Sequence, residues 1–574
     1  MRLVYKQIAK ELFKNLFSVI LIFLLVFFTS FMYFFVHFSI DGNMIVLNAL
    51  SSLSENQVLY KNALSSNTIL ARNMLIASIL LTSFVYFVFF QRFYKKNSKD
   101  LGCFKALGIK DYSIASCFAI FSAIISVLGG LIGLIIGYFA SDILIEAGIK
   151  SYEVSCLVKS VTLISVIIGI FLPAAVFCLV ALITYFMICS KETALLLFPR
   201  SDTSSSPLFL RIAHKLASLC PGKNKFAVRL ALRKPVALLL ILIAVISFSV
   251  MFMMAYSLNL SSSKIYESQM LGHHYLFDVH LDAPTQLENP LSYTMPYLDA
   301  YGNIETEDFV VNQQIISFEH NSSLFELMDD KGNLIPTPKA GEIVISPALR
   351  DLYNIKEKDS ITLCIQNSRK TFIVSAIAYN AKLNSVYIAP VDLEAMMALP
   401  EHSYTGIWSM EKTTHAVTAI TRERKIADLE RNLVSNRTSA IINQVVGCLI
   451  GCILLFLALL LNFQDNTEDM LILSMMGKSP RAIRKTLIDI YLPIVCIFFI
   501  VGLWPSVQIV KAILRSLSLQ IGDYMPFQTN PLVIAGIFML LNITYMLVQF
   551  TFSLGIKKVI NADNVYAYIS NEFT

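Results

Sequence analysis

The nine residues Asp100–Gly108, with the sequence DLGCFKALG, return in altered form 369 positions later as Asp469–Gly477, with the sequence DMLILSMMG. Each copy opens on an acidic residue, continues through seven mostly apolar residues and closes on a glycine. Each copy also follows a long apolar run, has basic residues beside it and leads into another apolar run. A short amphipathic element that is repeated between membrane spans predicts two equivalent contacts with one partner on the same side of a membrane.

The composition indicates a membrane protein. Apolar residues make up 56% of the 574 residues and charged residues only 15%, whereas an ordinary soluble domain has roughly half and a quarter. A helix needs about 20 apolar residues to cross the hydrocarbon core of a bilayer. Eight runs reach this length, at 16–38, 73–90, 114–139, 160–188, 236–256, 445–463, 487–510 and 531–554. We therefore predict a polytopic α-helical protein, whose first run is too long for a signal-peptide core and is retained.

The distribution of Lys and Arg predicts the orientation of the spans. With a cytoplasmic N-terminus, the five inner segments carry 4, 6, 9, 4 and 2 of these residues, and the three short outer loops carry two each. The positive-inside rule then places both termini in the cytoplasm. The long segment 257–438 does not decide the orientation, because long segments cross a membrane regardless of charge. The net charge of +6 comes from the inner segments and indicates no nucleic-acid partner.

A basic helix is expected before the first span and again before the fifth. Cations recur at four-residue spacing with apolar residues between them, which puts the cations on one helical stripe. Such a helix can lie on the inner leaflet, with its cations near anionic head groups; a generic positive-inside flank is the alternative. The stripes are formed by Arg2, Lys6, Lys10 and Lys14 in the first copy, and by Lys225, Arg229 and Arg233 in the second.

These repeats divide the chain into two halves of four spans each. The first half covers 1–200, the second covers 222–574, and the Ser-rich stretch within 201–221 reads as a linker. Each half runs as basic helix, span, outer segment, span, repeated element, span, outer loop and span. The outer segment is short in the first half and long in the second, where 257–444 forms the one sizeable extracytoplasmic domain.

Alternating and β-branched residues predict the structure of that domain. We expect a strand at 342–346, a helix at 347–353, and further strands at 360–365, 371–377 and 385–388. The charged segment 425–436 is expected to be a helical stalk that leads into the sixth span. In the third span, the glycines 129, 133 and 137 are four residues apart, a spacing that lets another helix approach closely.

The repeated elements resemble the coupling segment of FtsX/MacB-type ABC transporter permeases, which is written as Glu, x, Gly, x, x, basic, Ala, Leu or Met, Gly. The first copy matches this pattern nearly position for position, through Asp100, Gly102, Lys105, Ala106, Leu107 and Gly108. The second copy keeps Asp469, Met476 and Gly477, with Leu471 where Gly is expected. The stretch from Gly341 to Leu363 is similar to the β-rich part of the family's extracytoplasmic domain.

The resemblance implies a permease subunit with two fused halves in a bacterial plasma membrane. A separate cytoplasmic ABC ATPase, acting as a dimer, would bind ATP and Mg and push the coupling elements, so the chain itself needs no cofactor and no metal. The residues expected to form the docking surface are Asp100, Gly102, Phe104, Lys105, Ala106, Leu107, Gly108, Asp469, Met475, Met476 and Gly477. The substrate would be an amphipathic or antimicrobial peptide, a lipopeptide or a lipid-linked molecule. The bacitracin-resistance permeases are more distant relatives of this kind, with ten spans.

Two other functions compete with transport. The chain could be a non-transporting mechanical regulator, whose outer domain activates a cell-wall hydrolase or a sensor kinase. It could also be a membrane enzyme, but we find no candidate active site. The stretch Gly477-Lys478-Ser479 resembles the end of a P-loop, yet Ile472 stands where that motif requires a glycine.

Two groups of polar residues allow more than one interpretation. His273, His274, Asp278 and His280 cluster on a predicted strand; a solvent-facing polar face is expected there, with a metal site as the alternative. Asp489, near the inner start of the seventh span, is either a carboxylate favoured by a helix dipole or a group coupled to a cation.

Overall fold

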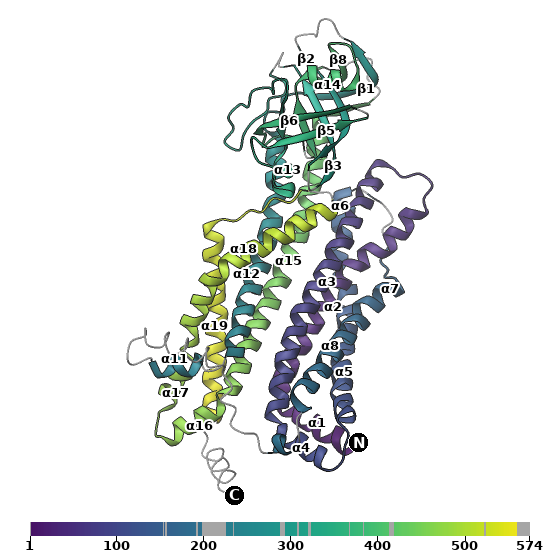
Figure 1. The fold of residues 1–574 in the computed structure, drawn as a ribbon. Coiled ribbons are helices and arrows are strands. Elements are labelled where there is room, and N and C mark those ends of the chain that lie inside the picture. The colour runs from purple at the N-terminus through teal and green to yellow at the C-terminus, as the bar shows by residue number, and fades with distance from the viewer. Residues whose placement is uncertain are drawn as a thin grey trace. The chain divides into compact units, whose positions relative to one another are not determined.

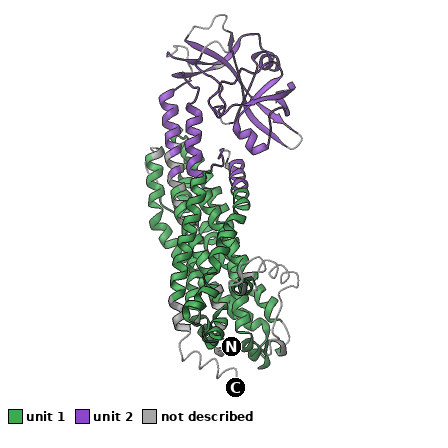
Figure 2. Cartoon of the chain, turned by 90° about the vertical axis from the view of Figure 1, so that its left-hand side faces the viewer, with its two compact units in different colours: residues 1–255, 441–510, 529–574 green, residues 256–440, 511–528 purple. Residues whose placement is uncertain are grey.

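The computed structural model describes residues 2–152, 154, 158–190, 193–197, 225–232, 235–286, 293–306, 309–319, 323–366, 368–382, 384–411, 418–521 and 524–559 (Figure 1). The predicted linker 201–221 and Arg233 lie outside the described residues. The chain forms two compact units (Figure 2). One contains residues 1–255, 441–510 and 529–574. The other, here called the sheet domain, contains residues 256–440 and 511–528.

Helices of the first half account for the first four predicted spans. Their bounds are α1 (Arg2–Lys14), α2 (Leu16–Ala49), α3 (Glu55–Lys96), α4 (Ser98–Ala106), α5 (Asp111–Ala140), α6 (Asp142–Tyr152), α7 (Leu163–Val166), the π-helix η1 (Ile167–Phe171), α8 (Leu172–Cys189) and α9 (Thr193–Leu197). Helix α2 contacts α3 and α5, and α8 contacts the same two helices, so the four long helices form a bundle. The fourth span is thus built from α7, η1 and α8 in succession.

The glycines of α5 allow the close packing that their spacing predicts. A Cβ at Gly133 would lie 2.8 Å from the backbone nitrogen of Phe31, and one at Gly137 would lie 2.9 Å from Cβ of Phe34. Both distances are too short for a real side chain, so α2 and α5 approach each other at a separation that only glycine permits. The sequence-based prediction of a helix-contact stripe is confirmed.

Helices of the second half are α11 (Lys225–Leu232), α12 (Pro235–Met270), α15 (Arg422–Asp465), α16 (Thr467–Met475), α17 (Pro480–Leu487), α18 (Tyr491–Ile521) and α19 (Pro531–Val559). Among the described residues, seven helices of the whole chain are long and apolar enough to cross a membrane. The predicted sixth span falls within α15, whose apolar part is the shorter stretch Gly447–Leu461. The chain is therefore a multi-pass membrane protein, and its eighth span stays a prediction.

Besides parts of α12, α15 and α18, the described residues of the sheet domain form nine strands and two short helices: β1 (Phe277–Gln286), β2 (Thr294–Glu305), β3 (Val310–Phe318), β4 (Glu342–Ile345), α13 (Pro347–Tyr353), β5 (Ser360–Ile365), β6 (Ser368–Ile377), β7 (Ser385–Ile388), α14 (Pro390–Met397), β8 (Ser403–Ser409) and β9 (Thr418–Thr421). The expected strands and helix between residues 342 and 388 are confirmed. Each of these strands contributes alternating or continuous apolar residues to a buried core that includes Ile343, Leu363 and Val386.

The strand order shows that most of the sheet closes on itself. The order is β3-β7-β4-β6-β5-β2-β8-β1-β9, and β3 also pairs with β2. Six strands, from β2 through β3, β7, β4 and β6 to β5, therefore form a ring, and β8, β1 and β9 extend from it. Closing a sheet removes its unpaired edges, which are otherwise sites of aggregation. A second core, around the fully buried Trp408, fills the region beside β8.

The C-terminal part of α18, from Lys511, belongs to the sheet domain and not to the unit that holds the rest of this helix. Arg515 donates from Nε to the carbonyl oxygen of Leu352, at 2.8 Å. The hydroxyl of Tyr524 donates to the carboxylate of Asp351 at the same helix, α13. Lys511 and Arg515, four residues apart just after an apolar run, were the available signal for a helix that continues beyond its span.

Candidate functional site

The two repeated elements adopt the same structure in the same register. Helix α4 covers Ser98–Ala106 and α16 covers Thr467–Met475, so both are nine residues long and both ends are 369 positions apart. Each begins after an asparagine, Asn97 or Asn466, that stands between the element and the long helix before it. The next helices, α5 and α17, begin at the equivalent positions Asp111 and Pro480. A shared sequence pattern has thus produced the same helix–turn–helix at two places.

Both elements end in the same glycine turn. Gly108 has φ +82° and Gly477 has φ +77°, in the left-handed region that favours glycine. In the first copy, Gly108 N–H donates to the carbonyl of Lys105 and Ile109 N–H donates to that of Phe104. In the second copy, the amides of Gly477 and Lys478 donate to the carbonyls of Ser474 and Leu473. This pair of bonds defines a Schellman motif, which explains why each element closes on glycine.

An exposed apolar side chain stands immediately before each glycine. Leu107 is 76% exposed and Met476 is 70% exposed. Phe104, which the sequence pattern placed on the docking surface, is only 7% exposed and packs inward. Asp100, Ala106 and Met475 are also exposed. Leu107 and Met476 are therefore the most exposed apolar side chains of the two elements, and the second element also exposes Ile472 and Met475.

Buried residues fix the other side of each helix. Leu101 and Met470, again at equivalent positions, are almost completely buried. A Cβ at Gly102 would lie 3.1 Å from side-chain atoms of Leu196 and Leu197, because α9 packs closely on α4. In the second copy, Leu471 occupies the position of Gly102. The glycine of the family pattern is thus explained by the contact with α9 in the first copy.

Lys105 ties the first element to its neighbours. Its Nζ donates to the carbonyl oxygen of Cys189 at the end of α8, at 2.9 Å, and pairs with Asp111 Oδ1 at 3.1 Å. The hydroxyl of Tyr185 donates to the same carboxylate oxygen. The second copy has Ser474 and Pro480 at the positions of Lys105 and Asp111. The second copy therefore cannot form the same ion pair. In the first copy, Lys105 positions α4 against its neighbours.

In both basic helices the described side chains divide into a buried and an exposed group. In α1, Ile8 and Leu12 are buried while Lys6 and Lys10 are exposed. In α11, Arg229 is exposed, and Ala227 and Ala231 are the buried residues. Helix α1 contacts α5, and α11 contacts α17, so both copies occupy equivalent places. Lys6, Lys10 and Asp100 line one open pocket between α1 and α4. The side chains of Lys14 and Lys225 are outside the described part.

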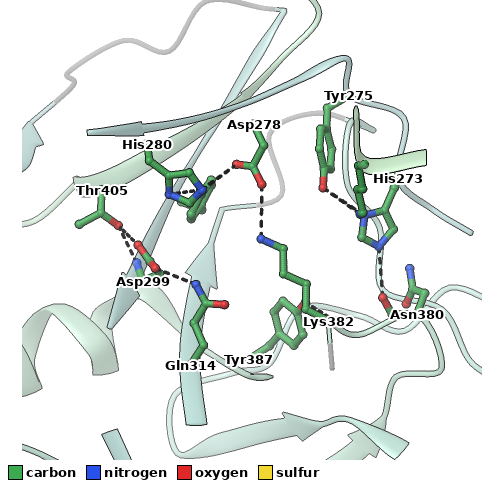
Figure 3. Close-up of polar contacts among 12 residues, drawn as sticks. His273, Tyr275, Asp278, His280, Asp299, Gln314, Asn380, Lys382, Tyr387 and Thr405 are labelled. Atoms are coloured by element: carbon green, nitrogen blue, oxygen red, sulfur yellow. Dashed lines mark hydrogen bonds and ion pairs between the residues drawn. The ribbon is translucent and has the colours of Figure 1, made fainter. Parts of the chain in front are cut away.

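A network of buried polar groups forms a second candidate site, in the sheet domain (Figure 3). His273 is 3% exposed. Its Nδ1 accepts from Lys425 Nζ at 3.0 Å, and its Nε2 lies 3.2 Å from the carbonyl oxygen of Asn380. Lys425 Nζ also donates to the hydroxyl of Tyr275, at 3.3 Å. These contacts fit a neutral imidazole that carries its proton on Nε2.

Asp278 lies in the same network, and its position corrects a prediction. The expected solvent-facing strand face is wrong for this residue, because Asp278 is buried. Its carboxylate accepts from Tyr297 Oη at 2.8 Å and from Lys382 Nζ at 3.4 Å, as Figure 3 shows for the lysine. His280 Nδ1 lies 3.1 Å from the same tyrosine hydroxyl, while His274 is exposed. No group of three or more His, Cys, Asp or Glu residues that could hold a metal occurs among the described residues.

Burial shifts the pKa values of this network. The pKa of His273 lies well below its ordinary value, first because of burial and then because Lys425 is close. Burial, followed by repulsion from Lys382, lowers the pKa of Lys425 to about 8. Burial and then the Asp278 carboxylate raise the pKa values of Tyr275 and Tyr297. The protein therefore keeps an uncharged histidine against a lysine whose charge is unfavourable.

Asp489 lies between two helices, where α17 has ended and α18 has not begun. Its Oδ1 accepts from Gln549 Nε2 at 2.6 Å and lies 3.6 Å from Arg484 Nε. Its carbonyl accepts from the amide of Leu492 in the first turn of α18. This position is the one that the helix-dipole interpretation predicts for a carboxylate.

Comparison with protein families agrees with the internal repeat. The model of the FtsX-like permease C-terminal domain matches the chain twice, over residues 73–193 and 444–559. Each matched region contains one of the two helix–glycine elements, with α4 in the first and α16 in the second. Comparison with curated proteins gave no significant match. The FtsX-like permease C-terminal domain thus matches both halves of the chain, which is consistent with a permease of the two-halves FtsX/MacB type.

Proposed function

We propose that this chain is the permease subunit of an ABC transporter, in which a separate ATPase moves the sheet domain. FtsX-like permeases are membrane subunits that generally pair with cytoplasmic ATPases. The observation that carries the proposal is the matched pair of helices α4 and α16, each with an exposed apolar residue beside its Schellman glycine. Two equivalent elements suit a partner with two equivalent docking sites.

Docking would rest on Leu107 and Met476. An exposed apolar side chain is the kind of anchor that fills a pocket on a partner. Leu101 and Met470 bury the opposite side of each helix, so a push on the exposed side would move the helix as a rigid element. ATP and Mg would be bound by the ATPase dimer, and the permease would carry neither. Both termini, α1 and α11 would then lie on the cytoplasmic side of a bacterial plasma membrane.

Movement would reach the sheet domain along three helices. Helices α12, α15 and α18 each contain residues of both compact units, and α18 carries Pro505 inside its length, which removes one bond of its ladder. Ser257 in α12 accepts from the amide of Gln528, at 2.8 Å, and Arg515 in α18 donates to Leu352. A continuous helix transmits displacement because its hydrogen-bond ladder resists bending. We therefore favour a rigid-body movement of the hinge-and-shear kind.

The substrate class rests on the resemblance to the family. We propose an amphipathic or antimicrobial peptide, a lipopeptide or a lipid-linked molecule, for export or resistance. The same three helices also favour the second function, a non-transporting regulator that activates a cell-wall hydrolase or a two-component sensor kinase. In that case the movement of the sheet domain would itself be the output.

Site-specific crosslinking tests the docking proposal. A photo-reactive amino acid is placed at position 107 or 476 in cells that express the candidate ATPase, and crosslinked products are identified by mass spectrometry. Both positions should capture the ATPase. Position 373 is the control, because Ile373 is also exposed but belongs to the sheet domain and to neither repeated element. Capture from position 373 alone, or from none of the three, would refute the assignment.

Flexible insertions test the mechanical part. A Gly-Ser segment in α12 near Ser257, with another in α15 near Ser435, should leave ATPase activity intact and abolish the biological output. An Arg515→Ala substitution should weaken output in the same direction. Full output with both insertions would mean that the sheet domain is a passive binding site. Two readouts separate the candidate functions. Loss of substrate resistance would indicate a transporter, and loss of hydrolase or kinase activation would indicate a regulator.

A further inference from the structure

A pocket opens in the sheet domain where α15 begins. Its volume is about 280 Å³, and its charged lining comes from Asp278, Lys382, Arg422, Lys425 and Asp428. These residues reach the pocket from β1, from the loop before β7 and from the first two turns of α15. Three positive groups and two negative groups thus meet in a space that side chains do not fill.

The two carboxylates of the pocket already have hydrogen-bond or ion-pair partners. Asp278 accepts from Tyr297 and from Lys382, and Asp428 pairs with Arg431 Nη1 at 3.5 Å. Arg422 and Lys425 differ from these groups: within the part of the chain that the structure describes, neither side chain pairs with a carboxylate. The pocket therefore has two cationic side chains that form no ion pair with a carboxylate among the described residues.

Lys425 is largely buried and reaches only neutral acceptors. Its Nζ donates to His273 and Tyr275, which supply no negative charge. The charged groups that face it are Lys382 and Arg422, which oppose its protonation, and Asp278, which favours it. A buried ammonium group without a counter-ion is costly, so an anion that entered the pocket would be stabilised.

The backbone adds to the positive field. Helix α15 begins at Arg422, and the partial positive charge of a helix N-terminus favours anions. Thr421, which also lines the pocket, accepts from the amide of Arg424. Side chains and helix end thus act in the same direction.

From this geometry we propose that the pocket binds an oxyanion, a phosphate or carboxylate group, with Arg422 and Lys425 as its direct ligands. The anion is either free in solution or carried on a lipid. A cationic ligand is disfavoured, because it would meet two positive groups that form no ion pair and carboxylates that already have partners. The inference goes beyond the proposed function and does not depend on it, because no residue of α4 or α16 takes part.

Titration of the purified full-length protein in zwitterionic nanodiscs tests this proposal. The probes are inorganic phosphate, acetate and dihexanoyl phosphatidic acid, in chloride-containing HEPES buffer, with binding measured by calorimetry and by thermal shift. Lys425→Met and Arg422→Gln should each weaken binding at least tenfold. Arg424→Gln is the matched control, since Arg424 is exposed on the same turn of α15, and it should bind as the unaltered protein does.

The outcomes separate the possible sources of the anion. Tighter binding of phosphate or acetate than of the short-chain lipid supports a soluble ligand, and the reverse order supports a lipid phosphate. Affinity should also fall when the pH rises above 8, as Lys425 loses its proton. No binding of any probe, or equal affinities in all four proteins, would overturn the proposal. ATPase crosslinking at position 107 is unaffected by either result, so failure here leaves the docking assignment intact.

Discussion

Leu107 and Met476 are structural equivalents: each directly precedes a left-handed glycine at the end of a nine-residue helix, and they are 76% and 70% exposed. Single substitutions at these residues should therefore separate docking from folding. Leu107→Asp and Met476→Asp should reduce stimulation of the partner ATPase while membrane insertion stays normal, because neither side chain supports the core. We expect the larger loss at Leu107, since Lys105 holds α4 in place. ATPase activity in co-reconstituted vesicles measures the effect.

Leu334→Asp provides the control for this comparison, because Leu334 is 62% exposed but belongs to the sheet domain. Equal stimulation by all three variants and the unaltered protein would remove Leu107 and Met476 from the docking surface.

The glycines of the two turns should be sensitive to alanine for conformational reasons alone. A Cβ at Gly108 or Gly477 would meet no atom within 4 Å, yet both residues have positive φ. Gly108→Ala and Gly477→Ala should each cost about 1 kcal/mol and lower the coupling of ATP hydrolysis to output. Gly536→Ala is the matched control: a Cβ there also meets nothing, but its φ is not positive. Thermal unfolding that ranks Gly536→Ala with the other two would contradict this reasoning.

The ion pair of Lys105 with Asp111 should matter more than an ordinary surface pair. Lys105 also donates to Cys189, so Lys105→Met removes two contacts that hold α4 against α5 and α8. A double-mutant cycle with Asp111→Asn should give a coupling free energy of roughly 1 kcal/mol in thermal unfolding. The control pair is Lys159 with Asp142, whose atoms are 2.7 Å apart and whose carboxylate is more exposed than that of Asp111. Its coupling free energy should be smaller. The reverse order would show that Lys105 does not position the element.

His273 should make the sheet domain sensitive to acid. The folded protein keeps this residue neutral, whereas the unfolded chain takes up a proton near the ordinary pKa of 6.5. Below pH 6.5 the unfolded state therefore binds more protons, and stability falls by up to about 1.4 kcal/mol for each pH unit. Above pH 6.5 this contribution is constant. The slope of stability against pH, measured by chemical denaturation, should flatten in His273→Gln but persist in His402→Gln, whose imidazole is exposed.

Lys425 should destabilise the fold at neutral pH. Its pKa falls from 10.5 to about 8 in the folded state, so Lys425→Met should raise stability at pH 7 by roughly 2 kcal/mol. Between pH 8 and 10.5 the folded protein releases this proton before the unfolded chain does. Stability of the unaltered protein therefore rises over that window, and the advantage of the variant should shrink. A difference that stays constant from pH 7 to 10.5 would show that the buried charge is not its cause.

The sequence by itself determined the elements that local chemistry governs. Hydrophobic run length placed seven helices that can span a membrane, and alternation placed the strands between residues 342 and 388. The repeat at Asp100 and Asp469 predicted two equivalent elements, and the family match at 73–193 and 444–559 agrees with it. These features can be predicted from the sequence because hydrophobic periodicity and a helix end on a left-handed glycine depend only on neighbouring residues.

Only the tertiary structure decided which side chains face a partner and which are buried. Phe104 and Leu107 are both apolar residues of one short helix and its cap, yet only the packing of α4 makes the first buried and the second exposed. His273 and Lys425 are 152 positions apart, and Asp278 is buried because Tyr297 and Lys382 close over it. The physical reason is the same in each case. The burial and the pKa of a side chain depend on distant chain segments that meet in the fold, and a local sequence pattern does not contain that information.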